Sequence, residues 1–264
     1  HRDLHSFPTR RSSDLYILVT DALLSLLKPE EVDAVIAHEI GHVKRNHILF
    51  YLFFFVGYML FSYAIFDLML YAIIYTEPLY RFVIESGLSH TTVASTLITL
   101  MTVIVFLVYF RYIFGYFMRN FERQADGYVY TLFNTAGPLI STFEKIVLTT
   151  GQSPDRPNWH HFSIAQRVRH LVQAEQDRRW VTRHDRKVRR SILLYGLGMA
   201  LVAVIGYVLN FGETGRRLNA NLLETVIQRE IQEKPDSSGL FGLLGDLYYR
   251  SEERRVGKEC RSRW

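Results

Sequence analysis

The sequence predicts a mainly α-helical protein that spans a membrane several times, with at most a small β element near its N-terminus. Three apolar runs lie at residues 48–75, 91–116 and 191–211. At ~1.5 Å per residue, a helix over each run is long enough to cross a bilayer core of about 30 Å. Buried helices of a soluble protein are the alternative for the first and third runs, although such long apolar stretches are rare outside membranes.

The two ends of the chain, residues 1–15 and 250–264, read as translated sequencing-adapter DNA. One choice of codons for the C-terminal peptide gives an opposite strand that, in a shifted frame, encodes the N-terminal peptide. We therefore leave both ends out of the fold prediction, as a fusion scar would be left out. The remaining segment, residues 16–249, is expected to be an internal fragment of a longer protein.

The composition gives no evidence for nucleic-acid binding once the two ends are set aside, and we expect no nucleic-acid partner. The ends hold nine of the 31 Lys and Arg residues and five of the 26 Asp and Glu residues. The rest of the chain then has 22 basic and 21 acidic residues, a net charge of about +1, so no basic partner surface is predicted. The single cysteine, Cys260, lies in the C-terminal end, so the rest of the chain has no disulfide framework and suits a reducing compartment.

Two short elements are expected before the first apolar run. Residues 16–20 (YILVT) are β-prone and predict a strand, and Asp21 can cap a short helix that ends near Leu27. A longer helix is predicted to begin at Pro29, because proline and acidic residues are favoured in a first helical turn.

This longer helix carries the most informative motif of the chain, His38-Glu39-Ile40-Gly41-His42. Positions i and i+4 of a helix share one face, so His38 and His42 can hold one metal ion. Glu39 lies where its carboxylate can take a proton from a water at that ion. The H-E-x-x-H spacing is typical of zinc peptidases. Because the first apolar run begins six residues after His42, the metal helix is predicted to continue into a transmembrane hairpin. The metal site is therefore predicted at a membrane surface.

A third ligand is expected from the segment that follows the second apolar run. Two histidines leave a catalytic zinc site one protein ligand short. The second run returns the chain to the side that it left and leads into Glu122 and Asp126, which share a helical face. Glu122 can bind the metal and Asp126 can orient a ligand histidine. The alternative for Glu122 is a solvated charge at a helix end.

The distribution of basic residues predicts the orientation of these helices. Lys44, Arg45, Arg119 and Arg123 flank the first two runs on one side, and residues 156–190 add many more arginines there. The turn at residues 76–90 has one Arg and two Glu. Cytoplasmic segments carry the excess of Lys and Arg, so the metal site is predicted in the cytoplasm and the third run leads outward.

The ordered set of motifs resembles a known family. HEIGH, a transmembrane hairpin, FERQAD at residues 121–126 and WHHFSIAQRV at residues 159–168 are similar to integral-membrane zinc metallopeptidases. That group joins the HtpX quality-control proteases to the CAAX prenyl endopeptidases, and the resemblance covers residues 16–171. It implies one Zn²⁺ per chain bound by His38, His42 and Glu122, with Glu39 as the general base. It also assigns Asp126 to the aspartate that follows the third ligand.

The same resemblance singles out one histidine and one arginine further along. In the family a histidine precedes two prolines and an arginine six positions on, which points to His161 and Arg167. Their implied role is to stabilise the oxyanion of the tetrahedral intermediate and to organise the site. Here Phe162 and Ser163 stand in place of the prolines, so the choice between His160 and His161 stays open. A pair of surface loop residues is the alternative for these histidines.

The segment after the third run, residues 212–249, is expected to be helical and extracytoplasmic. Its spacing fits the start of a tetratricopeptide repeat, with a single amphipathic helix as the alternative. The residues that carry the pattern are Pro235, Phe241, Leu244, Gly245 and Tyr248. Such repeats bind protein partners.

The resemblance implies a zinc metalloendopeptidase that hydrolyses membrane-associated polypeptides in quality control or in protein processing. The membrane would be the bacterial cytoplasmic membrane, or that of the endoplasmic reticulum in a eukaryote. A non-catalytic, zinc-binding membrane scaffold with tetratricopeptide partner binding is the alternative, although a structural zinc site needs no base such as Glu39. A transporter is disfavoured because three spans and one buried acid give little pathway chemistry. The family's edge strand, on which substrates align, is missing before Tyr16, so we expect this fragment to bind substrate poorly.

Overall fold

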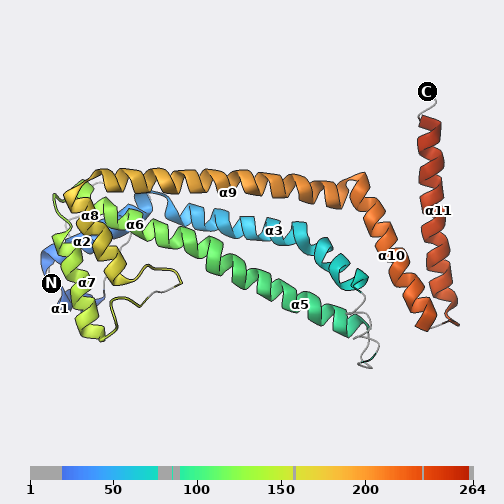
Figure 1. The fold of residues 1–264 in the computed structure, drawn as a ribbon, viewed down its shortest axis with the longest axis horizontal. Coiled ribbons are helices and arrows are strands. Elements are labelled where there is room, and N and C mark those ends of the chain that lie inside the picture. Colours follow the sequence, from blue (N-terminus) through green and yellow to red (C-terminus); the bar gives the residue numbers. More distant parts are fainter. Residues whose placement is uncertain (1–19, 77–84, 86–89, 157–158, 234, 262–264) are drawn as a thin grey trace, which may run out of the picture. The chain divides into compact units, whose positions relative to one another are not determined.

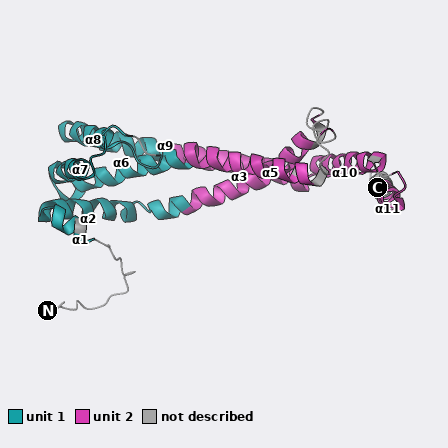
Figure 2. Cartoon of the chain, turned by 90° about the horizontal axis from the view of Figure 1, so that it is seen from below, with its two compact units in different colours: residues 1–51, 114–189 teal, residues 52–113, 190–264 magenta. Residues whose placement is uncertain are grey.

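A computed structural model describes residues 20–76, 85, 90–156, 159–233 and 235–261, and within these ranges the chain forms helices and no β-strand. The mainly α-helical prediction is therefore confirmed. The predicted strand lies outside the described residues except for Thr20. Two units divide the chain: residues 1–51 with 114–189, and residues 52–113 with 190–264 (Figure 2). We call them the first and the second unit.

The first unit begins with α1 (Asp21–Leu26), whose cap differs from the prediction. The side chain of Thr20, one residue before Asp21, accepts a hydrogen bond of 3.3 Å from the Leu23 amide. Thr20 has the extended backbone of a cap residue, whereas Asp21 is already helical. The prediction that Asp21 caps the helix is therefore wrong by one position, and Asp21 instead favours the positive end of the helix dipole.

Helix α2 (Pro29–Lys44) begins at the predicted proline and is tied to α7 (Gly137–Thr150) through one buried carboxylate. Glu31 accepts hydrogen bonds from the Lys145 ammonium at 2.6 Å and from the Ser141 hydroxyl at 2.7 Å. Glu31 also accepts a hydrogen bond of 2.7 Å from the Lys28 amide, which closes the first turn of α2. These bonds, the one from Lys145 above all, lower the pKa of Glu31 to about 2, so it stays ionised at any physiological pH.

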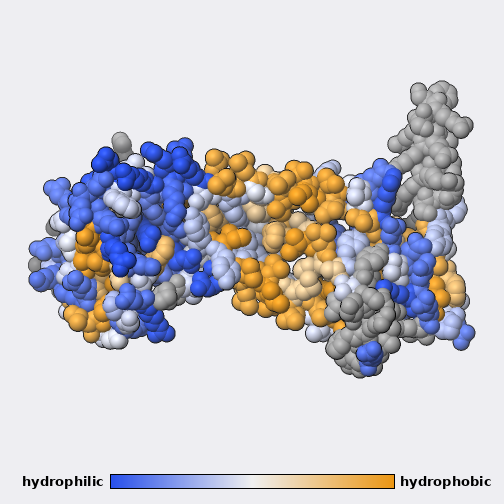
Figure 3. Space-filling view, viewed as in Figure 1, coloured by the Kyte–Doolittle hydropathy of each residue, from blue (hydrophilic) through white to orange (hydrophobic). Residues whose placement is uncertain are grey.

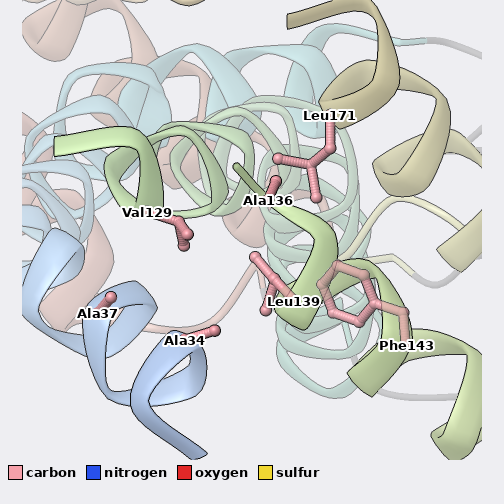
Figure 4. Close-up of a cluster of buried hydrophobic side chains, with 7 residues drawn as sticks. All are labelled: Ala34, Ala37, Val129, Ala136, Leu139, Phe143 and Leu171. Atoms are coloured by element: carbon pink, nitrogen blue, oxygen red, sulfur yellow. The ribbon is translucent and has the colours of Figure 1, made fainter. Parts of the chain in front are cut away.

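The apolar core of the first unit lies where α2, α6 (Gly115–Leu132), α7 and α8 (Ile164–Gln176) meet (Figure 4). Its buried members are Ala34, Ala37, Val129, Ala136, Leu139, Phe143 and Leu171. The two alanines of α2 face α6, and small side chains let the two helix backbones approach closely.

Gly41 marks the closest approach of α2 and α6. A Cβ atom at this position would lie 2.8 Å from Tyr128 Cβ and 3.1 Å from Ala125 Cα. Because the second of these neighbours is backbone, it cannot move aside without moving the helix. Gly41 therefore sets the distance between the helix that carries His38 and His42 and the helix that carries Glu122.

A left-handed residue separates α2 from α3 (His47–Tyr75), although the sequence predicted that the metal helix would continue into the first span. Arg45 is the C-cap residue of α2. Asn46, the next residue, has φ 55°, a left-handed conformation that asparagine adopts more readily than most residues. The break redirects the chain so that His47, the first residue of α3, lies back against α2.

The second unit holds most of the apolar helices. The described chain has three helices long and apolar enough to cross a membrane, at His47–Ile73, Ser95–Leu132 and Arg179–Phe211. These correspond to α3, to α5 (His90–Val108) continued through the π-helix η1 (Tyr109–Phe114) into α6, and to α9 (Arg179–Phe211). On the face drawn in Figure 3, apolar side chains gather over α3, α5 and α9, which is the surface that a bilayer would cover.

A buried tyrosine joins these three helices within the second unit. The hydroxyl of Tyr109 donates to the Phe54 carbonyl at 2.7 Å and lies 2.6 Å from the Tyr195 hydroxyl. Tyr109 lies in the π-helix, and Phe54 and Tyr195 lie in α3 and α9. Polar groups in a membrane interior need such partners, because no water is present to bind them.

The chain continues into α10 (Glu213–Glu233) and α11 (Ser238–Arg261), which pack against each other in the second unit (Figure 1). The Tyr248 hydroxyl donates to Glu224 at 2.5 Å across this pair. Two paired helices agree with the predicted helical segment, and the tetratricopeptide repeat stays a prediction.

Gly41→Ala should lower both stability and metal binding. Overpacking at a closely approached backbone costs on the order of 1–3 kcal/mol of unfolding free energy. Because α2 and α6 would separate, bound zinc measured by mass spectrometry should fall as well. Gly239→Ala is the matched control, since a Cβ at Gly239 meets nothing within 4 Å. Unchanged zinc content in Gly41→Ala would show that the helix spacing does not govern the site.

Candidate metal centre

The centre is built on the face of α2 that is turned toward α6. His38 and His42 are one turn apart, and their Nε2 atoms lie 3.2 Å from each other. Both side chains are largely shielded from solvent, with exposed fractions of 11% and 20%. Glu39, on the neighbouring face of the same turn, is exposed. The predicted base is thus accessible to water beside two inward-facing imidazoles.

Helix α6 brings a carboxylate to the same point. Glu122 Oε1 lies 3.5 Å from His42 Nε2, and Glu122 Oε2 lies 3.7 Å from His38 Nε2. One ligand atom from each of the three residues can be chosen so that all lie within 4.8 Å of one another. The structure therefore brings together the three residues predicted as metal ligands, although the membrane hairpin separates Glu122 from the histidines in sequence.

Both histidines have partners on their other ring nitrogen. His38 Nδ1 lies 3.0 Å from Asp126 Oδ1, a close ionic contact that is not aligned as a regular hydrogen bond. His42 Nδ1 lies 2.9 Å from His47 Nδ1. Asp126 can accept a proton from Nδ1 of His38, and the contact with His47 is compatible with the same tautomer of His42, in which Nδ1 carries the proton. Burial and the neighbouring His38 also lower the pKa of His42, so its ring is neutral, as metal binding requires.

With this tautomer, the Nε2 atoms of His38 and His42 present only lone pairs to the centre. Each Nε2 is then an acceptor, and the Glu122 carboxylate offers only acceptors, so the three groups repel one another unless a cation lies between them. Ligands at about 2.0–2.1 Å from a tetrahedral zinc ion lie roughly 3.3 Å apart. The observed spacings of 3.2, 3.5 and 3.7 Å match this value. The donor set fits zinc.

Asp126 and Arg167 form a buried pair behind the centre. Asp126 has no exposed surface, and it accepts two hydrogen bonds from Arg167, at 2.9 Å from Nε and 2.6 Å from Nη2. Burial would lower the pKa of Arg167, but Asp126 outweighs it and raises that pKa. Arg167 Nη2 also lies 3.5 Å from Glu122. The structure thus places Arg167 where it orients Asp126 and Glu122, and its predicted role at the oxyanion stays a prediction.

His161 reaches the centre from the loop before α8. Its Nδ1 atom lies 3.1 Å from Glu122 Oε2, and its side chain is 38% exposed. The ring of His160 packs on His161 with centroids 4.1 Å apart. Of the two histidines that the sequence left open, His161 makes the contact with Glu122.

His47 is a residue of the site that we did not predict. It is 1% exposed, its ring stacks on Phe121 at 4.3 Å, and its Nδ1 contacts the ligand His42. Gln124 adjoins His47 and donates to Asp185 at 2.9 Å. Asp185 in turn pairs with Arg45 at 2.7 Å. A histidine directly before an apolar run was the available signal.

Comparison with known proteins agrees with this geometry. The family model of peptidase family M48 matches residues 5–175. The chain belongs to peptidase family M48. The matched residues include every predicted ligand, the predicted base Glu39, and His161 and Arg167. Among curated proteins and solved structures, no significant match was found.

In this M48 peptidase, His47→Ala should weaken zinc binding while leaving the fold intact. Loss of an outer partner of a metal-bound histidine typically lowers metal affinity about 10- to 100-fold. We expect that decrease in a chelator competition titration, with the helical circular dichroism unchanged. Lys44→Ala is the control, because Lys44 is exposed on the same helix. Equal zinc affinity in the two variants would remove His47 from the site.

Proposed function

We propose that this M48 peptidase is a zinc-dependent integral-membrane endopeptidase. The observation that carries the proposal is the cluster of three acceptor groups, His38, His42 and Glu122, with Glu39 exposed beside it. Three protein ligands leave a fourth position open, which is the arrangement of catalytic zinc sites rather than structural ones. A bound zinc ion would supply a Lewis acid and a water whose pKa is near neutrality.

The residues around the centre have complementary tasks in peptide hydrolysis. Glu39 takes a proton from the attacking water and passes it to the leaving amine. His161 is placed to donate a hydrogen bond to the oxyanion, because its side chain lies 3.1 Å from Glu122 and is 38% exposed at the edge of the centre. Asp126, held by Arg167, keeps His38 in the orientation in which its Nε2 faces the centre.

The site is proposed to lie at the cytoplasmic face of the membrane. Three candidate spans support an integral membrane protein. Basic residues near Lys44, Arg119 and Arg189 support the orientation, since cytoplasmic segments are enriched in Lys and Arg. The proposed substrate is a membrane-associated polypeptide, cleaved in quality control or processing as in the HtpX and CAAX branches. A protein partner bound through α10 and α11 is part of the same proposal.

Glu39→Gln should abolish cleavage and keep zinc. The amide cannot accept the proton, while no ligand is altered, so zinc content by mass spectrometry should equal that of the wild type. Turnover of an unfolded membrane protein in detergent micelles should fall by at least about 1,000-fold. Wild-type-like turnover would refute the assignment of the base.

Glu122→Ala should lower zinc occupancy itself. The variant removes one of three ligands and leaves two histidines, whose Nε2 atoms lie only 3.2 Å apart. Glu144→Ala, on α7 and exposed, is the control for loss of a carboxylate. An unchanged zinc content in Glu122→Ala would exclude Glu122 from the ligand set and with it the proposed centre.

A further inference from the structure

The loop that carries His161 is attached to α6 by two arginines that the chemistry above does not use. Arg119, Glu122, Arg123 and Asp126 follow the i, i+3, i+4, i+7 spacing and therefore share one face of α6. The two acids of this face belong to the metal centre. The two arginines contact residues 159–162 instead, on either side of His161.

The two attachments differ in kind. Arg119 Nη1 donates a hydrogen bond of 2.7 Å to the Trp159 carbonyl, which fixes the backbone two residues before His161. The guanidinium carbon of Arg123 lies 3.6 Å from the centre of the Phe162 ring, which is a close face-on stack. Arg119 also lies over this ring, at 6.0 Å. Backbone and side chain are thus held on both sides of the histidine.

Arg123 is held against the Phe162 ring. It is only partly exposed, and its Nε atom makes no hydrogen bond to any residue that the structure describes. A planar guanidinium stacks on an aromatic face in a way that an ammonium group cannot. The identity of both partners, rather than charge alone, therefore matters at this contact.

The far end of the loop is fixed independently. Ser163 caps α8 by accepting a hydrogen bond of 3.3 Å from the Gln166 amide, and Gln166 Oε1 accepts one of 3.3 Å from the Ser163 amide. This capping box orders the residue directly after Phe162. The loop that carries His161 is therefore held by the cap of α8 at its end and by the two arginines at Trp159 and Phe162.

We propose that Arg119 and Arg123 are positioning residues that clasp the 159–162 loop and hold His161 over the metal centre. The clasp is a property of the chain's own residues and does not require zinc. Its effect on catalysis rests on the proposed function, because His161 must act at the transition state for its position to affect turnover. The structural and catalytic consequences can therefore be tested separately.

The first experiment measures the clasp without zinc. In the 264-residue chain with Trp180→Phe and Trp264→Phe, the remaining Trp159 reports on the loop by acrylamide quenching of its fluorescence. Arg123→Ala and Phe162→Leu should each raise the quenching constant, at most about twofold because Trp159 is already 44% exposed. Arg123→Lys should behave like Arg123→Ala, whereas Phe162→Tyr should keep the wild-type value.

The control is Arg169→Ala, which removes an exposed arginine of α8 and should leave quenching unchanged. A double-mutant cycle between Arg123→Ala and Phe162→Leu completes this experiment. The two changes should not add, because each removes the same contact. Additive effects, or quenching equal to that of Arg169→Ala, would overturn the clasp whether or not the protein proves to be a peptidase.

The second experiment measures turnover of the zinc-loaded protein in detergent micelles. Arg123→Ala should lower kcat about tenfold with KM little changed, because the loop would position His161 less often at the transition state. Arg123→Ala combined with His161→Ala should be no slower than His161→Ala alone. If quenching responds and kcat does not, the clasp exists but does not position a catalytic histidine, and the proposal fails at that step.

Discussion

The structure depends on one electrostatic constraint: the groups that converge between α2 and α6 are all acceptors. Asp126 and His47 occupy the Nδ1 atoms of His38 and His42, so both Nε2 lone pairs face the Glu122 carboxylate. Acceptor groups 3.2 to 3.7 Å apart in a shielded site form a set that could hold a cation. The capacity of this site to hold a metal therefore depends on the neighbouring side chains as much as on His38, His42 and Glu122 themselves.

Two backbone features make this convergence geometrically feasible. Gly41 removes the Cβ that would keep α2 away from the backbone of α6 at Ala125. Asn46 adopts a left-handed conformation and ends α2, so that the first residue of α3 turns back toward His42. On an unbroken helix His42 and His47 would be about 140° apart and could not meet. Gly41 and Asn46 thus shape the candidate metal centre through the backbone, although neither is a candidate ligand.

Most of the fold and of the candidate ligand set could be predicted from the sequence, because both depend on local periodicity. Apolar runs predict the spans, and the i, i+4 spacing predicts which of His38, His42, Glu122 and Asp126 share a face. His47 and the bidentate Asp126–Arg167 pair could not be predicted in this way. Their contacts arise from the left-handed break at Asn46 and from the packing of α8 on α6, which are tertiary features. The cap at Thr20 was missed by one position because Thr and Asp are similar N-cap residues.

The charges of the site explain why Arg167 is buried so deeply. A carboxylate without exposed surface, such as Asp126, is stable only when a partner neutralises it, and Arg167 does so through two hydrogen bonds. With a divalent cation bound, the carboxylates of Glu39, Glu122 and Asp126 and the guanidinium of Arg167 give a formal charge of zero. Without Arg167 the loaded site would carry an excess negative charge. The arginine behind the centre therefore balances negative charge that a divalent cation alone would leave uncompensated.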